Sequence, residues 1–122
     1  MAKKVGLVVD DEPDIIEHIS SIISSEGFDV ISCQSGRQAV KLAEEKQPDF
    51  VLLDIFLEDI DGGEVANQLS KNPSTKNIPI IYLTGLVTRQ EQKEVSKTGK
   101  HYVIAKPVLK SELLGLIHKV LV

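Results

Sequence analysis

The chain has 122 residues, enough for one domain with its own hydrophobic core. Its composition, with 42% hydrophobic and 26% charged residues, is that of a globular protein and excludes disordered, collagen-like and coiled-coil classes. The net charge of -4 has the wrong sign for gripping nucleic acid or an anionic membrane by charge alone, so neither is expected as a partner.

The cysteine count and the N-terminus bear on where the protein acts. The single cysteine, Cys33, can form no disulfide within the chain, so nothing points to an oxidising compartment. The apolar residues 5–9 are followed at once by Asp10, Asp11 and Glu12, far short of a signal or membrane-spanning segment. We therefore expect a cytoplasmic protein that is neither exported nor anchored in a membrane.

Short apolar runs alternate with segments of helical period along the chain. The runs lie at 5–9, 30–33, 50–53, 80–83 and 102–105. All but the second are nearly continuous in apolar residues, which is typical of parallel strands covered on both faces. The first helix is expected between Pro13 and Gly27, on the apolar stripe Ile15, Ile16, Ile19, Ile22 and Ile23. Further helices are expected at about 37–46, 63–71, 88–97 and 111–120.

This alternation predicts an α/β fold that occupies residues 1–122 as one domain. Right-handed crossovers favour a five-stranded parallel sheet of order 2-1-3-4-5 with five helices on both faces, the flavodoxin-like arrangement. The helix at 88–97 has Val95 as its one sizeable apolar residue and should be the least firmly packed. In such a sheet, ligands bind beyond the carboxyl ends of the first and third strands.

Polar residues stand where the predicted strands end. Asp10 and Asp11 follow the first strand, and Asp54, Thr84 and Lys106 follow the third, fourth and fifth. Because these ends share one edge of the sheet, three carboxylates should converge there, and a hard cation such as Mg2+ would offset their charge. The set also suits phosphoryl transfer, in which an Asp carboxylate attacks phosphorus while an ammonium and a hydroxyl contact the phosphoryl oxygens.

Each of these residues also has a simpler explanation. Asp11, just before Glu12 and Pro13, could cap the first helix. Asp54 could be a loop residue and Lys106 a solvated charge. Their joint placement at successive carboxyl ends of one sheet favours a functional site over coincidence.

Five segments of the chain match the motifs of a known family. They are Val8-Val9-Asp10-Asp11-Glu12, Asp49-Phe50-Val51-Leu52-Leu53-Asp54, Asp61-Gly62, Ile80-Ile81-Tyr82-Leu83-Thr84 and Lys106-Pro107. On these segments, and over essentially its whole length, the chain resembles a response-regulator receiver domain of two-component signalling. Such a domain is a phosphorylation-controlled switch, not an enzyme, and it catalyses only its own phosphoryl acceptance and dephosphorylation.

The resemblance implies a role for each site residue. Asp54 would accept a phosphoryl group from the phosphohistidine of a histidine kinase. The metal, Mg2+ with Mn2+ as a substitute, would bind Asp10, Asp11, Asp54 and the backbone carbonyl of Phe56. Thr84 would be the switch hydroxyl and Lys106 the cation that contacts the phosphate, with a cis peptide bond between Lys106 and Pro107.

The resemblance also implies partners. A sensor histidine kinase or a phosphotransfer protein would supply the phosphoryl group. A downstream effector, or a fused output domain, would bind the face formed by the helix at 88–97, the strand at 102–105 and the helix at 111–120. The alternative functions are a phosphate sink and a docking module that is not phosphorylated.

The chain departs from the family pattern at three positions. Glu58 stands where a proline is common, which predicts a less rigid and more acidic loop. Val103 replaces a common aromatic residue, and Tyr102, one position earlier, should point to the other face of its strand. Gly85 replaces the commoner alanine after Thr84, which loosens the backbone.

The remaining motifs are assigned no chemistry. Glu58 and Asp59 are interpreted as part of a solvated acidic loop, and Asp61-Gly62-Gly63 as a turn that begins a helix. The histidines, His18, His101 and His118, lack metal-ligand spacing.

Phe56 and Leu86 should flank the approach of water to a phosphoryl group and slow its hydrolysis.

Two other classes of protein fit the sequence less well. A flavin-binding electron carrier would need a phosphate-binding loop after the first strand, where Asp10, Asp11 and Glu12 would repel a phosphate. A phosphatase with an Asp nucleophile would need an acid two residues after Asp54, and Phe56 stands there.

Overall fold

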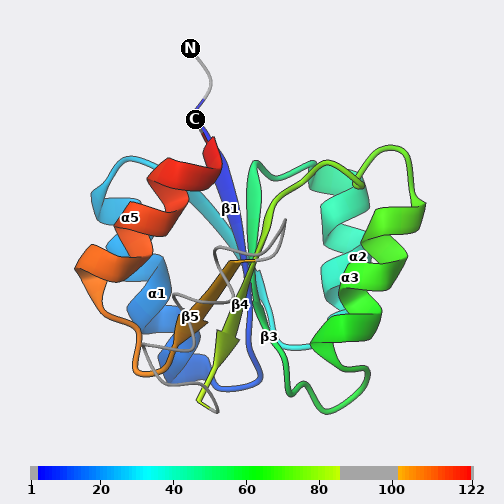
Figure 1. Cartoon of the computed structure of the whole chain (residues 1–122), viewed down its shortest axis with the longest axis horizontal. Helices are drawn as coiled ribbons and strands as arrows, with labels where there is room; N and C mark the ends of the chain where they lie inside the picture. The colour runs from blue at the N-terminus through cyan, green and yellow to red at the C-terminus, as the bar shows by residue number, and fades with distance from the viewer. Residues whose placement is uncertain (1–2, 86–101, 122) are drawn as a thin grey trace.

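Parallel strands and helices alternate along the chain in a computed structural model that describes residues 3–85 and 102–121 (Figure 1). The elements are β1 (Val5–Val9), α1 (Pro13–Ser25), β2 (Asp29–Cys33), α2 (Gly36–Lys46), β3 (Phe50–Asp54), α3 (Gly62–Lys71), β4 (Ile80–Thr84), β5 (Tyr102–Ala105) and α5 (Lys110–Leu121). The helix expected at 88–97 lies outside the described residues. No helix in the described part is long and apolar enough to cross a membrane.

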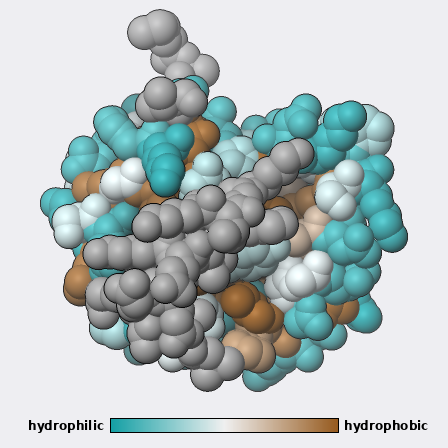
Figure 2. All heavy atoms as spheres, in the orientation of Figure 1, coloured by the Kyte–Doolittle hydropathy of each residue, from teal (hydrophilic) through white to brown (hydrophobic). Residues whose placement is uncertain are grey.

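The five strands form one parallel sheet in the order β2-β1-β3-β4-β5, which confirms the predicted flavodoxin-like fold. Helices α1 and α5 cover one face of the sheet, and α2 and α3 cover the other (Figure 1). The outward surfaces of α2 and α3 are mainly hydrophilic, as expected of amphipathic helices that bury one side (Figure 2).

Alternate residues of each strand supply two separate cores. Val8, Leu52 and Ile104 belong to the core under α1 and α5, while Leu7 and Val51 belong to the core under α2 and α3. Central strand β3 is buried along its whole length, which explains why its sequence is continuously apolar up to Asp54. Full burial of each large apolar side chain contributes about 1.5–3 kcal/mol of transfer free energy, so these two cores position the sheet edge firmly.

The strand register determines which side chains meet at the carboxyl edge of the sheet. Val9 pairs with Leu53, Asp54 with Leu83 and Thr84 with Ala105, so β1, β3, β4 and β5 end at nearly the same level. Strands β3 and β4 each extend one residue beyond the predicted run and thereby include Asp54 and Thr84. The backbone amide of Ile55 also donates to Leu83 across the sheet at 3.3 Å, so the ladder continues just past Asp54. The side chains that follow these strands therefore meet at one edge.

Candidate functional site

Lys106 lies between two buried carboxylates at the carboxyl edge of the sheet. Its Nζ is 2.9 Å from Asp10 Oδ2 and 3.4 Å from Asp54 Oδ2. Asp10 is fully buried, Asp54 is 4% exposed, and Thr84, at the end of β4, is also buried. Burial alone would lower the pKa of Lys106, but the neighbouring carboxylates of Asp10 and Asp54 outweigh it and raise that pKa. The predicted convergence is therefore observed for Asp10, Asp54 and Lys106.

The backbone holds Lys106 in this position. The peptide bond between Lys106 and Pro107 is cis, as the resemblance implied. The backbone amide of Lys106 donates to the carbonyl of Thr84 at 2.9 Å, which extends the pairing of β4 and β5 by one residue. The ammonium therefore projects from a segment tied to the strand that carries Thr84.

Three acidic residues after β1 form a group that can hold a cation. Carboxylate oxygens of Asp10, Asp11 and Glu12 lie within 4.8 Å of one another. Asp10 Oδ1 accepts from the backbone amide of Glu12 at 2.9 Å, whereas the buried Oδ2 accepts no hydrogen bond in the described part of the chain. An oxygen-only donor set of three carboxylates, of which the Lys106 ammonium offsets one at 2.9 Å, fits a hard divalent ion. Glu12 was not among the ligands expected from the sequence.

The alternative explanation of Asp11 as a cap of the first helix is wrong. Helix α1 begins at Pro13 with Glu12 as its N-cap residue, and no side chain makes the capping hydrogen bond. Pro13 has no amide hydrogen to satisfy, and the Glu12 amide is already bound by Asp10. The half-buried Asp11 carboxylate is therefore not engaged at the helix start.

The segment from Ile55 to Asp61, here called the acceptor loop, carries the residues that follow Asp54. The Phe56 amide donates to Asp54 Oδ1 at 3.1 Å, which leaves Oδ2 directed at Lys106. At the far end, the Gly62 amide donates to the Ile55 carbonyl at 2.8 Å. A Cβ on Gly62 would come 2.8 Å from the Asp54 carbonyl oxygen, so glycine permits this close approach.

Acidic residues of the acceptor loop differ in what they bind. Asp59 is exposed, as expected of a solvated acidic loop, and it also accepts from the backbone amides of Gly36 and Arg37, at 2.8 and 3.0 Å. The Gly36 hydrogen bond, opposed by desolvation and supported by that of Arg37, lowers the pKa of Asp59 to about 2. Asp61 caps α3 by accepting from Glu64 at 2.8 Å, which confirms the predicted helix start. Sequence spacing carried no signal for the contact of Asp59, because its partners lie 23 and 22 residues away.

Tyr102 and Val103 face opposite sides of β5, as expected. Tyr102 packs against the core under α5, and Lys119 Nζ lies 5.9 Å from the centre of its ring. Val103 is buried at 7% exposure on the side away from that core. Position 103 therefore offers no aromatic ring beside Thr84.

The histidines of the described residues do not join the acidic group. His18 Nε2 lies 2.9 Å from the Val108 carbonyl oxygen and so links α1 to the segment after β5. His118 lies in the last turn of α5, and His101 lies outside the described residues. Cys33, in edge strand β2, is buried, and this burial raises the pKa of its thiol to about 11.

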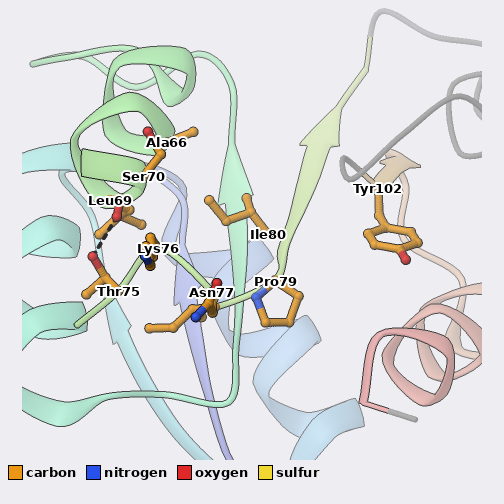
Figure 3. Close-up of a pocket in the computed structure, with 10 residues that line it drawn as sticks. Ala66, Leu69, Ser70, Thr75, Lys76, Asn77, Pro79, Ile80 and Tyr102 are labelled. Atoms are coloured by element: carbon orange, nitrogen blue, oxygen red, sulfur yellow. Dashed lines mark hydrogen bonds between the residues drawn. The ribbon is translucent and has the colours of Figure 1, made fainter. Parts of the chain in front are cut away.

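A cavity of about 760 Å³ lies at the opposite end of the sheet from the acidic group. Leu69 of α3, Thr75, Ile80 and Tyr102 are among its lining residues (Figure 3). The hydroxyl of Thr75 is already committed to the Leu69 carbonyl at 2.7 Å. The cavity therefore plays no part in chemistry at Asp54.

Comparison with known proteins decides the family. Residues 7–118 match the response regulator receiver domain. The chain belongs to this family. The receiver domain is 30% identical over 115 residues to the protein PilH of Pseudomonas aeruginosa, covering 94% of this chain and 95% of PilH. It is 31% identical to the polar-differentiation response regulator DivK of Brucella ovis, covering 88% and 87% of the two chains.

Solved structures agree with this assignment. The receiver domain of sensor histidine kinase PA1611 from P. aeruginosa, which has a magnesium ion coordinated in its active site cleft, is 27% identical with a TM-score of 0.85 over 98% of both chains. A response regulator from Desulfuromonas acetoxidans is 33% identical, with a TM-score of 0.81 over 97% of this chain and 96% of that one. Receiver domains also occur within longer proteins, since the chain spans 25% of a probable cyclic di-GMP phosphodiesterase of Vibrio cholerae.

Proposed function

We propose that residues 1–122 form one receiver domain in which phosphorylation of Asp54 controls the binding of a partner. The observation that carries the proposal is the position of Lys106, whose ammonium contacts both Asp10 and Asp54 at the carboxyl edge of the sheet. An ammonium beside a buried carboxylate offsets the charge that a phosphoryl group would bring. The donor would be the phosphohistidine of a sensor histidine kinase or of a phosphotransfer protein.

The reaction transfers one phosphoryl group between two side chains. Asp54 Oδ2 attacks phosphorus, an O–P bond forms, and the N–P bond of the donor histidine breaks so that its electron pair returns to the imidazole. Lys106 would contact one phosphoryl oxygen and Thr84 would donate a hydrogen bond to another. The Phe56 amide already holds the second oxygen of Asp54 at 3.1 Å and so orients the carboxylate.

A divalent ion would bind beside Asp54 in this proposal. Asp10, Asp11, Asp54 and the Phe56 carbonyl would hold Mg2+, or Mn2+ as a substitute. The grouping of the Asp10, Asp11 and Glu12 carboxylates within 4.8 Å supports a cation there. When bound, the ion supplies positive charge to the phosphoryl oxygens. The magnesium in the PA1611 receiver domain lends support by similarity.

Intact-mass spectrometry with a small phosphodonor tests the acceptor and the metal together. We expect a single phosphoryl adduct on the wild-type chain in Mg2+ or Mn2+, and none in EDTA or in Asp54→Asn. Asp29→Asn, an exposed aspartate at the start of β2, is the control and should be phosphorylated normally. An equal yield in EDTA would contradict the metal role, and an adduct on Asp54→Asn would contradict the acceptor.

The phosphorylated state should differ at the face that includes β5 and α5. We propose that Thr84 moves toward the phosphoryl group and shifts the segment after Gly85, most of which lies outside the described residues. An effector or a fused output domain would read this change, at a free-energy difference of about 1–3 kcal/mol. Beryllium fluoride with Mg2+ should shift amide resonances mainly between residues 85 and 102. Shifts confined to the acidic site, or equal shifts in Thr84→Ala, would favour a phosphate sink.

A further inference from the structure

The N-terminus of α2 is capped by the acceptor loop. An α-helix begins with backbone amides that have no partner within the helix. In α2 the Ser35 hydroxyl accepts from Gln38 at 3.1 Å, and the first two amides, those of Gly36 and Arg37, both donate to the carboxylate of Asp59. Two of the three capping hydrogen bonds thus come from a different part of the chain.

The backbones of the two segments are also in close contact. A Cβ on Gly36 would lie 2.5 Å from Ile60 Cγ1 and 3.0 Å from the Ile60 carbonyl oxygen. Only glycine leaves room for Ile60 at the first residue of the helix. The start of α2 and the tip of the acceptor loop are therefore held together by both packing and charge.

Other restraints act at the ends of the acceptor loop. The Phe56 amide binds Asp54 Oδ1, and the Gly62 amide binds the Ile55 carbonyl. Between these points, Leu57 is buried in the core under α2 and α3, whereas Phe56 is 57% exposed and Glu58 is exposed, without a side-chain hydrogen bond to any described residue. Among the described residues, Asp59 is the side chain of this loop that hydrogen-bonds to a helix not adjoining the loop.

We infer that Asp59 is a positioning residue, whose carboxylate ties the acceptor loop to α2 and thereby fixes the backbone of Phe56 beside Asp54. A carboxylate that accepts two amide hydrogen bonds at a helix N-terminus is a strong tether, because the partial positive charge of the helix end adds to the hydrogen bonds. The tether replaces the stiffness that a proline at position 58 would provide. Its effect on metal binding rests on the proposed function, whereas its effect on the loop does not.

The experiment compares Asp59→Ala with Glu58→Ala. Both variants remove one negative charge from neighbouring positions of the same loop, but only Asp59→Ala removes the contact with α2. Amide hydrogen exchange of Phe56 and Gly62 is measured in metal-free buffer, relative to the core amide of Leu52 in β3, which reports global unfolding. We expect exchange at both amides to rise by about tenfold in Asp59→Ala and to stay unchanged in Glu58→Ala. Unchanged exchange in Asp59→Ala would overturn the inference.

A calorimetric titration of the same variants with Mg2+ measures whether loss of the contact with α2 weakens metal binding at the acidic site. Asp59→Ala should weaken Mg2+ binding about three- to tenfold more than Glu58→Ala, because only Asp59→Ala removes the contact with α2. Both variants lose the same charge, so charge alone cannot produce the difference. Equal weakening would mean that charge alone matters and would overturn the positioning role at the metal. If the wild-type chain binds no Mg2+, the proposed function fails, while the exchange measurement still decides the role of Asp59 in the loop.

Asp59→Asn keeps the test decisive if the alanine variant does not fold. The amide oxygen of asparagine can accept from Gly36 or Arg37 without the full charge, so exchange at Phe56 should rise by less than in the alanine variant. Exchange at the Leu52 amide identifies any variant that has lost its global fold. Wild-type exchange at Phe56 and Gly62 in Asp59→Asn, together with wild-type Mg2+ affinity, would show that the carboxylate is not the tether.

Discussion

Lys106 Nζ lies closer to Asp10 Oδ2, at 2.9 Å, than to the Oδ2 of Asp54, at 3.4 Å. Asp10 is fully buried, and its Oδ2 accepts no hydrogen bond from the described residues. The ion pair with Lys106 therefore offsets the cost of burying this negative charge. The ammonium therefore stabilises the site mainly through Asp10. The contact with Asp54 is the longer of the two.

Lys106→Met should destabilise the metal-free chain because it leaves two buried carboxylates without a cation. Removing one partner of a buried ion pair costs about 3 kcal/mol, and added Mg2+ should recover part of that loss. Urea unfolding with and without Mg2+ measures both effects. Lys110→Met removes an exposed lysine at the start of α5 and should change the free energy of unfolding by about 0.5 kcal/mol or less. Equal losses in the two variants would contradict the role assigned to Lys106.

Asp54→Asn should stabilise the metal-free chain by about 1 kcal/mol, because Asp10 and Asp54 share one ammonium and their charges repel. Asp11→Asn should act in the same direction. Thermal unfolding in EDTA gives the comparison, with the exposed Asp29→Asn as the control. In saturating Mg2+ the order should reverse, since the wild-type chain gains more from the ion. A less stable Asp54→Asn in EDTA would mean that the ion pair outweighs the repulsion.

Phe56→Asn should shorten the lifetime of the phosphorylated chain. The Phe56 side chain is 57% exposed two residues after Asp54, where an apolar ring can exclude the attacking water. We expect hydrolysis to accelerate about three- to tenfold, which corresponds to an activation free energy lowered by up to ~1.4 kcal/mol. The loss of phosphoryl adduct over time, followed by intact mass, measures the rate. Leu109→Asn, at the other exposed large apolar residue of the described ranges, is the control. An unchanged lifetime in Phe56→Asn would refute the exclusion of water. Leu86, the second residue expected to flank the site, lies outside the described residues.

The contribution of Asp59 to stability should depend on pH. Its pKa falls from 3.8 to about 2 in the folded chain, so its stabilisation is complete above pH 3.8 and is lost as pH falls through about 2. Because the side chain is exposed and screened by solvent, Asp59→Asn should cost only about 1 kcal/mol at neutral pH, and the difference should vanish below pH 2. Ser35→Ala, which removes a neutral cap of the same helix, should show a difference that persists over this range. A pH-independent difference for Asp59→Asn would contradict the charged cap.

Local sequence patterns were sufficient for the strand order and for the helices and strands of the described residues. The predicted strands begin and end within one residue of the observed ones, because apolar runs bounded by turn residues encode a fully buried strand such as β3. Helix α2 ends at Lys46, and the next residue, Gln47, adopts a left-handed backbone conformation with φ of 48°. The sequence has no glycine at this position that would have predicted the end of the helix. Placement of acids, a hydroxyl and an ammonium at the ends of β1, β3, β4 and β5 follows from the parallel topology.

The sequence alone thus determined the receiver fold and the edge at which Asp10, Asp54 and Lys106 meet, because periodicity and the right-handed crossover rule are properties of neighbouring residues. Only the tertiary structure decided which oxygen each side chain engages. Lys106 pairs more closely with Asp10 than with Asp54, and Asp59 binds α2. Such contacts join residues far apart in the chain and depend on distances of a few tenths of an ångström, which the packing of helices against the sheet sets and no local pattern records.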